Sequence, residues 1–433
     1  VLACRLAAAG VDVRVLDAAA APDRTSRALG VQPRGAEVLD RTGALGDLPA
    51  RGVRLERVVV DLGGRTPVRL ELARAQRHLP TPGFIASQAD VEAALRERLA
   101  ALGVAVRWGH AVTAAAQDGA GVDVELSGGD GSAGGVRCGW LVGCDGAHSA
   151  VRGLAGIAFP GVQVVERFLL ADVRADLPLP RDAVSVWLRP EGMLGAFPLR
   201  AAGPGLWRLM APAAADRSGG RDAGDAAPAE LADRLTAVAG IPAGAVRSAA
   251  WTSTFRIHRR LADRFRAGRV LLAGDAAHVH SPLGGQGMNT GLGDAENLAW
   301  KLALVAGGRA HADLLDTYEA ERRPVAAGVL RATTGLTRTV VGGTPAARLL
   351  RDHLLVPLLG TAPVQQLVAR ESSQLTTTYR RGPLGGGPGR WAPRDPRPGD
   401  RVPDGPCRRE DGTGTRLHAE LRAGWALVLP AGG

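Results

Sequence analysis

The sequence contains almost no lysine, and its charge does not indicate a nucleic-acid-binding protein. Lys301 is the only lysine, so arginine supplies the rest of the 53 basic residues. Arginine, alanine, glycine and valine are enriched together, as codon bias would produce. Against 43 acidic residues the formal net charge is +10, but the arginines are scattered among aspartates, without a basic block or interleaved aromatic residues. We therefore expect no nucleic-acid partner.

Cysteines and long apolar runs are also scarce. The four cysteines contain no C-x-x-C pair, which argues against a zinc site and a disulfide framework. No run of 18 uncharged apolar residues is present, so no transmembrane helix is expected. No signal peptide is visible, and the expected location is the cytoplasm. With 433 residues, 45% of them apolar and 22% charged, the composition is that of a globular protein of two or three domains.

The beginning of the sequence reads as half of a dinucleotide-binding unit. Residues 1–10 form a helical pattern closed by Gly10, and the apolar strand 11–17 ends in Asp17. In a βαβ unit of this kind the acid binds a ribose hydroxyl, although Asp17 alone is also compatible with a residue that only ends a strand. The glycine-rich loop of such a unit would precede Val1, so we expect the sequence to be part of a longer chain.

Two further motifs place an aspartate beside a glycine after an apolar strand. "LVGCDGAHSAVR" contains Asp145, and "RVLLAGDAAHVHSPLGGQGMNTG" contains Asp275. The carboxyl ends of strands are where open α/β sheets bind ligands. The second motif is also dense in glycine where a helix begins, which exposes backbone amides to a negative ligand group. The residues at this helix start are Gly284, Gly285, Gly287, Met288, Asn289 and Gly291.

The remaining pattern gives a coarse order of elements. Residues 163–254 read as short strands split by glycine and proline, with a polar loop over 213–230. The end of the sequence, "WALVLPAGG", reads as a strand. Helices are predicted over 88–103, 291–308, 311–334 with an interruption at Pro324, and most of 335–370, followed by a Gly/Pro linker over 380–400.

Together these motifs resemble those of the FAD-dependent aromatic hydroxylases of the para-hydroxybenzoate hydroxylase fold, and most of all the polyketide-tailoring and rifampicin-type monooxygenases. The resemblance spans roughly residues 1–400 and rests on "VRVLD", "SRALGVQPRGAEVLD", "SQADVEAAL", "CDGAHSAVR", "GDAAHVHSPLGGQGMNTG", "YEAERRPVA" and "GDRVPD". The two aspartate motifs, in this order and about 130 residues apart, are its most specific part.

The resemblance implies an α/β fold. It comprises a three-layer FAD/NAD(P)-binding domain with an inserted β-sheet substrate domain, a helical C-terminal segment and a truncated thioredoxin-like tail. The implied FAD-binding segments are 1–52, 84–162 and 255–330; the substrate-domain segments are 53–83 and 163–254; 331–379 is helical; and 380–433 holds the linker and the partial thioredoxin-like domain.

The same resemblance assigns roles to single residues. Asp17 should accept hydrogen bonds from the adenosine ribose, Arg27 should lie against the FAD pyrophosphate, and Asp275 should bind the ribityl chain. Gln88 should touch the flavin side of the cofactor, and Asp145 should serve both FAD and NADPH. Val112 also belongs to the implied cofactor site. The last part of the site is the loop that wraps the isoalloxazine mainly through its backbone: Pro282, Leu283, Gly284, Gly285, Gln286, Gly287, Met288 and Asn289.

Other residues remain open between two interpretations. Trp187, Phe197 and Trp207 either line a substrate pocket or fill the core of the β-rich region. His278 and His280 are either acid/base groups or structural neighbours of the flavin. No catalytic residue and no metal ligand is assigned.

The implied reaction is monooxygenation. NADPH or NADH reduces FAD, O2 adds to the flavin C4a as a hydroperoxide, and the distal oxygen passes to an electron-rich phenolic ring. The expected substrate is a polycyclic phenol, with a smaller phenol or a rifamycin as alternatives. Baeyer–Villiger insertion, epoxidation, or a non-catalytic flavin- or ligand-binding role remain open, as does a monomer or a homodimer. Because the glycine loop would precede Val1, we expect residues 1–433 alone to bind FAD weakly or not at all.

Overall fold

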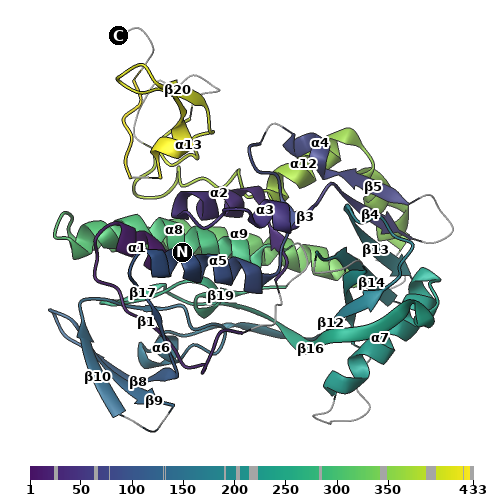
Figure 1. Cartoon of the computed structure of the whole chain (residues 1–433), viewed down its shortest axis with the longest axis horizontal. Helices are drawn as coiled ribbons and strands as arrows, with labels where there is room; N and C mark the ends of the chain where they lie inside the picture. Colours follow the sequence, from purple (N-terminus) through teal and green to yellow (C-terminus); the bar gives the residue numbers. More distant parts are fainter. Residues whose placement is uncertain are drawn as a thin grey trace.

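The computed structural model describes all residues except 24–27, 63–66, 78, 130, 132, 190–191, 201–204, 214–222, 282–284, 342–348, 387–395, 423 and 430–433. Helices and short strands alternate near the N-terminus, and a large sheet follows on the right of Figure 1. The α-helices of the described residues are α1 (Leu2–Ala8), α2 (Pro33–Thr42), α3 (Leu48–Arg51), α4 (Leu72–Gln76), α5 (Gln88–Ala101), α6 (Ala150–Leu154), α7 (Ala223–Ala239), α8 (Gly287–Ala306), α9 (Asp316–Val341), α11 (Val356–Leu359), α12 (Ala362–Ser372) and α13 (Leu417–Glu420).

Two parallel strand pairs form the part predicted to bind the cofactor. Strand β1 (Val15–Asp17) pairs with β7 (Val106–Trp108), and β11 (Leu141–Gly143) pairs with β18 (Val270–Leu272). Helix α1 ends before Gly10, whose φ of +79° suits glycine at a helix end, as predicted. The strand predicted over 11–17 forms only in its last three residues.

Two further small sheets have the orders β10-β9-β8 and β2-β6-β3, and β17 adds a third strand to the β11–β18 pair. A further hairpin, β20–β21, lies near the C-terminus. Their bounds are β2 (Gly30–Val31), β3 (Val53–Arg54), β6 (Phe84–Ile85), β8 (His110–Gln117), β9 (Val122–Gly128), β10 (Ala133–Cys138), β17 (Arg266–Ala267), β20 (Pro406–Arg408) and β21 (Gly414–Arg416).

The large sheet has eight strands in the order β19-β16-β12-β15-β14-β13-β4-β5. All neighbours are antiparallel except β13 and β4. Helix α7 packs on one face, where its leucines join Trp187, Trp207 and other sheet residues in one cluster. The strands are β4 (Arg57–Asp61), β5 (Val68–Glu71), β12 (Gly161–Ala175), β13 (Ala183–Arg189), β14 (Gly192–Pro198), β15 (Leu206–Pro212), β16 (Val246–Leu261) and β19 (His278–Val279).

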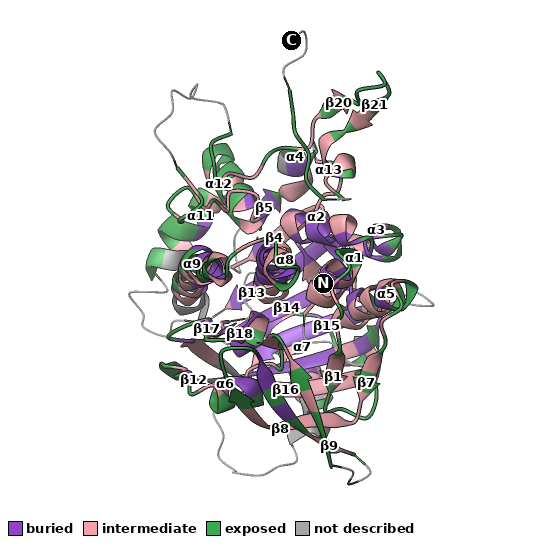
Figure 2. Cartoon of the chain, turned by 90° about the vertical axis from the view of Figure 1, so that its left-hand side faces the viewer, coloured by how far each residue is buried: buried purple, intermediate pink, exposed green. Residues whose placement is uncertain are grey.

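The other face of this sheet meets the N-terminal part of the chain. Leu29 and Ile85, which come from the predicted FAD-binding segments, cluster there with Val184 and Leu199 of the sheet region. Helices α8 and α9 pack together beside it, and the buried residues concentrate in α8 and the central strands (Figure 2). This face of the β-rich region therefore meets the predicted cofactor domain, in agreement with the predicted fold class.

Three predicted elements were wrong. Helix α9 runs through Pro324 without interruption, because Glu321 and Arg322, just before the proline, are held by buried partners on α8. Helix α7 occupies most of the second half of the predicted loop 213–230, since its leucines cover the sheet. The predicted C-terminal strand does not form over Trp425–Leu429, where no described strand lies alongside to share backbone hydrogen bonds.

Among the described residues, no helix combines the length and apolar character needed to cross a membrane, as the sequence led us to expect. The predicted domain boundaries and the thioredoxin-like character of the tail remain predictions.

Candidate active site

Asp145 and Asp275, two of the predicted cofactor residues, follow neighbouring strands at the same edge of the sheet. Gly143 of β11 lies opposite Leu272 of β18 in parallel register, so the segments with Asp145 and Asp275 follow side by side. Both carboxylates are exposed. Arg152 joins the two segments, because its guanidinium donates to the carbonyls of Ala276 at 3.0 Å and Ala147 at 2.9 Å.

The Asp145 carboxylate is engaged in its own turn. It accepts hydrogen bonds from the Ser149 hydroxyl and from the Val151 amide at 3.0 Å. Ser149 in turn accepts from the Arg152 amide at 2.9 Å and caps α6. Asp145 therefore stabilises the turn, while its exposure leaves lone pairs available to a ligand.

The turn that carries Asp275 rests directly on helix α8. Gly274 has a φ of +62°, and a Cβ at Gly291 of α8 would lie 3.4 Å from the Gly274 Cα. Small residues on both sides thus allow strand end and helix to touch. The Gly274 amide donates to Asp294 Oδ2 of α8 at 3.1 Å, and this bond fixes the turn on the helix.

Asp294 is the centre of a buried network that the sequence analysis did not identify. His278 Nε2 lies 2.6 Å from its Oδ2, and Arg322 Nε donates to its Oδ1 at 2.7 Å. Arg322 also donates to the Tyr379 hydroxyl and the Thr290 carbonyl, both at 2.9 Å. Burial alone would raise the pKa of Asp294, but His278 and Arg322 hold it below its usual value. The only sequence signal was the motif "YEAERRPVA", to which no role had been given.

His278 and His280 lie side by side behind the start of α8. Their rings are parallel within 8° and their centroids are 6.4 Å apart. Burial lowers the pKa of His280 to about 4, so this ring is neutral near pH 7. Among the described residues, His278 Nδ1 and His280 Nε2 have no hydrogen-bond partner although both atoms are buried. A Cβ at Gly287 would lie 3.5 Å from the His280 ring, which places His280 against the first turn of α8.

The loop before α8 is tied to the segment after residue 27. The Asn289 side chain donates to the carbonyls of Gly30 at 2.9 Å and Gly285 at 3.0 Å, and accepts from the Gln32 amide at 2.9 Å. Its polar side-chain atoms are thus used inside the protein, and its backbone is what remains for a ligand. Gln286 immediately precedes α8, and its side-chain oxygen accepts from Gln374.

The other predicted cofactor residues of this region occupy different positions. Met288 packs into the cluster around α2 and α5. Gln88 begins α5, where it accepts from the Ala28 amide at 3.4 Å and donates to Glu92 at 2.7 Å. Arg27, Pro282, Leu283 and Gly284 lie outside the described residues.

Asp17 and Val112 are brought to one end of the structure. Asp17 is exposed at the end of β1, and its Oδ1 accepts from the Ala19 amide at 2.9 Å. The Ala19 carbonyl accepts from the Gly109 amide at 2.8 Å, immediately before the strand that contains Val112. Asp17 ends β1 and Val112 lies on β8, whereas Asp145 and Asp275 follow β11 and β18.

A row of four side chains crosses the sheet on the face toward the predicted cofactor domain. Phe197 lies opposite Arg208, Arg208 opposite Asp172, and Asp172 opposite Trp251, on β14, β15, β12 and β16. Arg208 is buried and donates to Asp172 through Nε at 2.6 Å and Nη2 at 2.8 Å. Its guanidinium carbon lies 4.9 Å from the centre of the Trp251 ring. A buried ion pair flanked by two aromatic rings is a costly arrangement for stability alone.

The three aromatic residues predicted for the substrate pocket are separated. Phe197 belongs to this row and is half-buried. Trp187 and Trp207 belong to the opposite face, in the cluster with α7, and both are buried. Arg181 covers the Trp207 ring at 4.5 Å. Arg208 and Asp172 were not identified from the sequence, because a charged pair inside a strand pattern resembles two solvent-facing positions.

The donors and acceptors suit a flavin dinucleotide. Exposed carboxylates at strand ends accept hydrogen bonds from sugar hydroxyls, and the amides of the first turn of α8 point out of the helix toward a ligand. The buried Nε2 atom of His280, which has no hydrogen-bond partner among the described residues, lies beside Gly287 and adds a polar group at the start of α8. Within the described part of the chain no cluster of His, Cys, Asp or Glu is suited to a metal ion.

Comparison with known proteins agrees with this geometry. A family model described as "FAD binding domain" matches residues 1–333. The 12-dehydrotetracycline 5-monooxygenase/anhydrotetracycline 6-monooxygenase of Streptomyces rimosus is 38% identical over 100% of this chain and 83% of its own length. A rifampicin monooxygenase of Streptomyces venezuelae is 39% identical over 81% of this chain and 72% of its own. Among solved structures, OxyS anhydrotetracycline hydroxylase from Streptomyces rimosus has a TM-score of 0.78 at 36% identity, covering 98% of this chain and 81% of that one.

Proposed function

The chain belongs to the family of proteins with this FAD binding domain, and from that membership we propose that it is a monooxygenase that hydroxylates a polycyclic phenol with NADPH or NADH and O2. The observation that carries the proposal is the position of the Phe197–Trp251 row. It places two aromatic rings and a buried ion pair on the sheet face that meets the predicted cofactor domain.

Bound FAD supplies electron transfer from the nicotinamide and the activation of O2. The protein's part is to hold it. In our proposal Asp17 accepts hydrogen bonds from the adenosine ribose and Asp275 from the ribityl hydroxyls. The backbone between Gly285 and Asn289 lies against the ring system, while the Asp294 network keeps the Asp275 turn in place.

The protein's second part is to position the substrate. In our proposal a planar phenol lies over this row, against the rings of Phe197 and Trp251, and the Arg208 guanidinium, fixed by Asp172, favours the phenolate form of a nearby hydroxyl. A phenolate is richer in electrons than the phenol and reacts faster with an electrophilic oxygen. The surrounding apolar side chains of the sheet and α11 exclude water from this face.

The test is turnover of a defined substrate. The full chain, supplied with FAD and NADPH, is incubated with anhydrotetracycline under labelled dioxygen. We expect NADPH oxidation that depends on the phenol, and a product that carries one labelled oxygen as a ring hydroxyl. A labelled lactone would instead indicate Baeyer–Villiger insertion. FAD binding without substrate-dependent NADPH oxidation, over a panel of phenols, would contradict an oxygenase and favour a flavin-binding role.

The substrate face gives a more local prediction. Replacing Phe197 by Ala should raise KM for the phenol about fivefold, because an aromatic contact of roughly 1 kcal/mol is lost. FAD content should stay unchanged, since Phe197 is not among the residues proposed to hold the cofactor. Phe197→Leu, which keeps an apolar contact, should recover part of the affinity. Equal KM values in all three proteins would remove Phe197 from the substrate site.

A further inference from the structure

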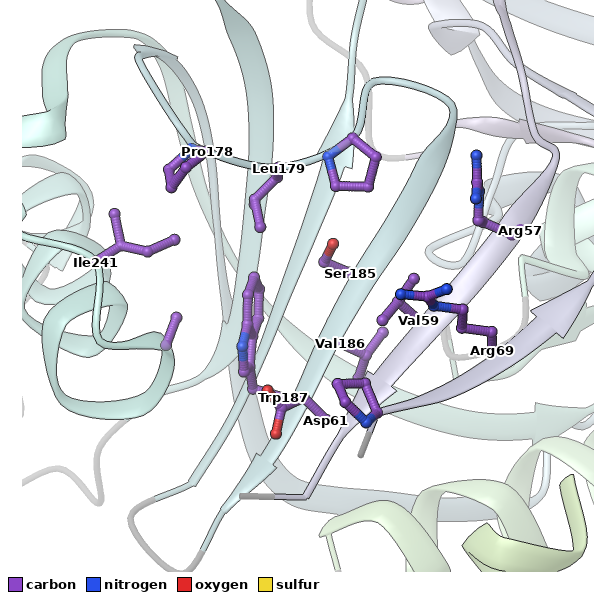
Figure 3. A pocket seen from close by; sticks show the side chains of 13 residues that line it. Arg57, Val59, Asp61, Arg69, Pro178, Leu179, Ser185, Val186, Trp187 and Ile241 are labelled. Atoms are coloured by element: carbon purple, nitrogen blue, oxygen red, sulfur yellow. The ribbon is translucent and has the colours of Figure 1, made fainter. Parts of the chain in front are cut away.

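A cavity of about 470 Å³ lies on the face of the eight-stranded sheet opposite to the Phe197–Trp251 row. Its floor is formed by Val59 of β4 and by Ser185 and Trp187 of β13. Leu179, on the segment before β13, and Ile241, after the end of α7, form its walls (Figure 3). Because Trp187 belongs to the face that α7 covers, this cavity is separated from the Phe197–Trp251 row by the thickness of the sheet.

One side of the cavity is apolar and built around an aromatic ring. Trp187 is only 6% exposed, so its ring is held by the protein and needs little ordering when a ligand binds. In Figure 3 the Trp187 ring stands between Ile241 on one side and Val59 on the other, with Pro178 and Leu179 beyond one end. A volume of this size lies within the range of small-molecule pockets and accommodates a few fused rings.

The other side is basic. Arg57 and Arg69 lie at the end opposite to Ile241 and Pro178 (Figure 3). Arg57 is hydrogen-bonded to Asp182, so its charge is compensated. The Arg69 side chain is exposed and forms no ion pair with any carboxylate of the described residues. Asp61, which also lines the cavity, is paired with Arg189 at 3.1 Å. The cavity thus combines a rigid aromatic wall with one uncompensated guanidinium.

We propose that this cavity binds a planar aromatic carboxylate. The rings lie along Trp187 and Leu179, and the carboxylate accepts hydrogen bonds from Arg69, whose planar fork matches two oxygens. The site is separate from the proposed active site and does not depend on the bound flavin.

The experiment uses 2-naphthoate as the probe and isothermal titration of the full chain with FAD. Arg69→Ala should weaken 2-naphthoate binding at least tenfold, and Ala239→Trp, at the end of α7, should fill the cavity and abolish it. Two matched controls should bind as the original protein does. Arg74→Ala removes an exposed arginine from α4 outside the cavity, and Ala237→Trp adds the same bulk at an exposed position of α7. The neutral amide 2-naphthamide should bind at least tenfold more weakly.

The other possible results of the titration distinguish between this cavity and the active site. Absence of binding to the original protein, or equal binding to all five proteins, overturns the proposal. Equal affinity for 2-naphthoate and 2-naphthamide contradicts the requirement for a negative charge. A binding event at the active site would be the same in all five proteins, and it disappears when a slow polycyclic substrate is present in excess. The rate of NADPH oxidation in the four variants reports whether they are folded.

Discussion

At the scale of single residues, the Asp275 turn depends on groups far from it in the sequence. Gly274 reaches its position because Gly291 leaves room, and its amide is held by Asp294, which is itself fixed by His278 and Arg322. The exposed carboxylate of Asp275 thus sits on a rigid base. Rigid support of this kind reduces the entropy lost when a ligand binds.

Asp275 should therefore contribute directly to cofactor affinity. In the proposed role its replacement by Ala removes a hydrogen bond to the ribityl chain and should weaken FAD binding about tenfold to a hundredfold. The measurement is flavin content after gel filtration together with a fluorescence titration. Asp263→Ala, which replaces an exposed aspartate between β16 and β17, is the control and should retain FAD. Unchanged retention in Asp275→Ala would exclude this role.

His280 should make stability depend on pH. Its folded pKa is about 4, below the ordinary value of 6.5, so the unfolded chain binds its proton first as pH falls. The free energy of unfolding should therefore decrease between pH 6.5 and 4, by roughly 2–3 kcal/mol from this group. The check is urea unfolding of the original protein and of His280→Gln at several pH values. The difference between the two should shrink as pH falls through this window; a constant difference would contradict the argument.

The sequence predicted those site residues whose chemistry is visible in a local motif. Asp145 and Asp275 each follow an apolar strand and lie directly beside a glycine, and the structure brings the segments that carry them to one edge. Asp294 lies eight residues inside a helix and shows no local signal, because its function depends on Arg322 of the next helix. The Arg208–Asp172 pair depends on the alignment of two strands. Such long-range contacts are set by tertiary packing, which a single sequence does not display.

At the scale of elements, helices α8 and α9 are joined by charges in their interior. Lys301 Nζ donates to Glu321 at 2.7 Å and to Asn297 at 2.9 Å, and Asn297 also donates to Glu321 at 2.7 Å. Lys301 is 0% exposed and Glu321 6%. Burial lowers the pKa of Lys301, while Glu321 opposes this change.

Removing one partner of the Lys301–Glu321 pair should lower the free energy of unfolding much more than replacing both partners by apolar residues. Lys301→Met leaves the Glu321 carboxylate buried with only the Asn297 amide and should lower the free energy of unfolding by about 3–5 kcal/mol. The double variant Lys301→Met/Glu321→Leu leaves no buried charge and should lie within about 2 kcal/mol of the original protein. Urea unfolding of the two single variants and the double variant measures the coupling. Additive losses would contradict a closed charge pair.

The same helix explains why local rules for elements were insufficient. Pro324 lacks a backbone N–H, so the sequence predicted an interruption, yet α9 continues. Its neighbours Glu321, Arg322 and Arg323 are all hydrogen-bonded to other elements, and these contacts compensate for one missing bond. For α7, the Ala/Asp/Gly-rich composition of 213–230 indicated a loop, because the residues that form the buried face of the helix, Leu231, Leu235 and Val238, come only after that stretch.

At the scale of the whole molecule, the C-terminal segment is fastened to the body at a few points. Arg401 donates to Glu37 of α2 at 2.9 Å, and Arg422 to Asp40 at 2.6 Å. The Tyr379 amide donates to the Gly399 carbonyl at 2.7 Å. In Figure 1 this segment stands above α2. The Trp425 ring also meets the Trp300 ring of α8 edge to face, with the ring centroids 5.4 Å apart.

Gly399 should be the residue on which this attachment depends. Its φ is +88°, and a Cβ there would lie 2.6 Å from the Arg380 amide nitrogen, too close for any side chain. Gly399→Ala should therefore detach the segment, increase hydrogen exchange at the Tyr379 amide and lower Tm by a few degrees. Gly405→Ala, whose Cβ would meet nothing within 4 Å, is the matched control. Equal exchange in the two variants would show that the attachment does not require Gly399.

The burial of Lys301 has a chemical consequence for the whole chain. It is the only lysine, so apart from the α-amino group the native surface offers no primary amine to acylating reagents or amine-directed cross-linkers. Acylation at this position requires α8 and α9 to separate, because the ammonium lies between them. The rate at which an activated ester modifies the Lys301 side chain therefore measures how often this helix pair opens. Mass spectrometry follows the modification at this one site, without any engineered label.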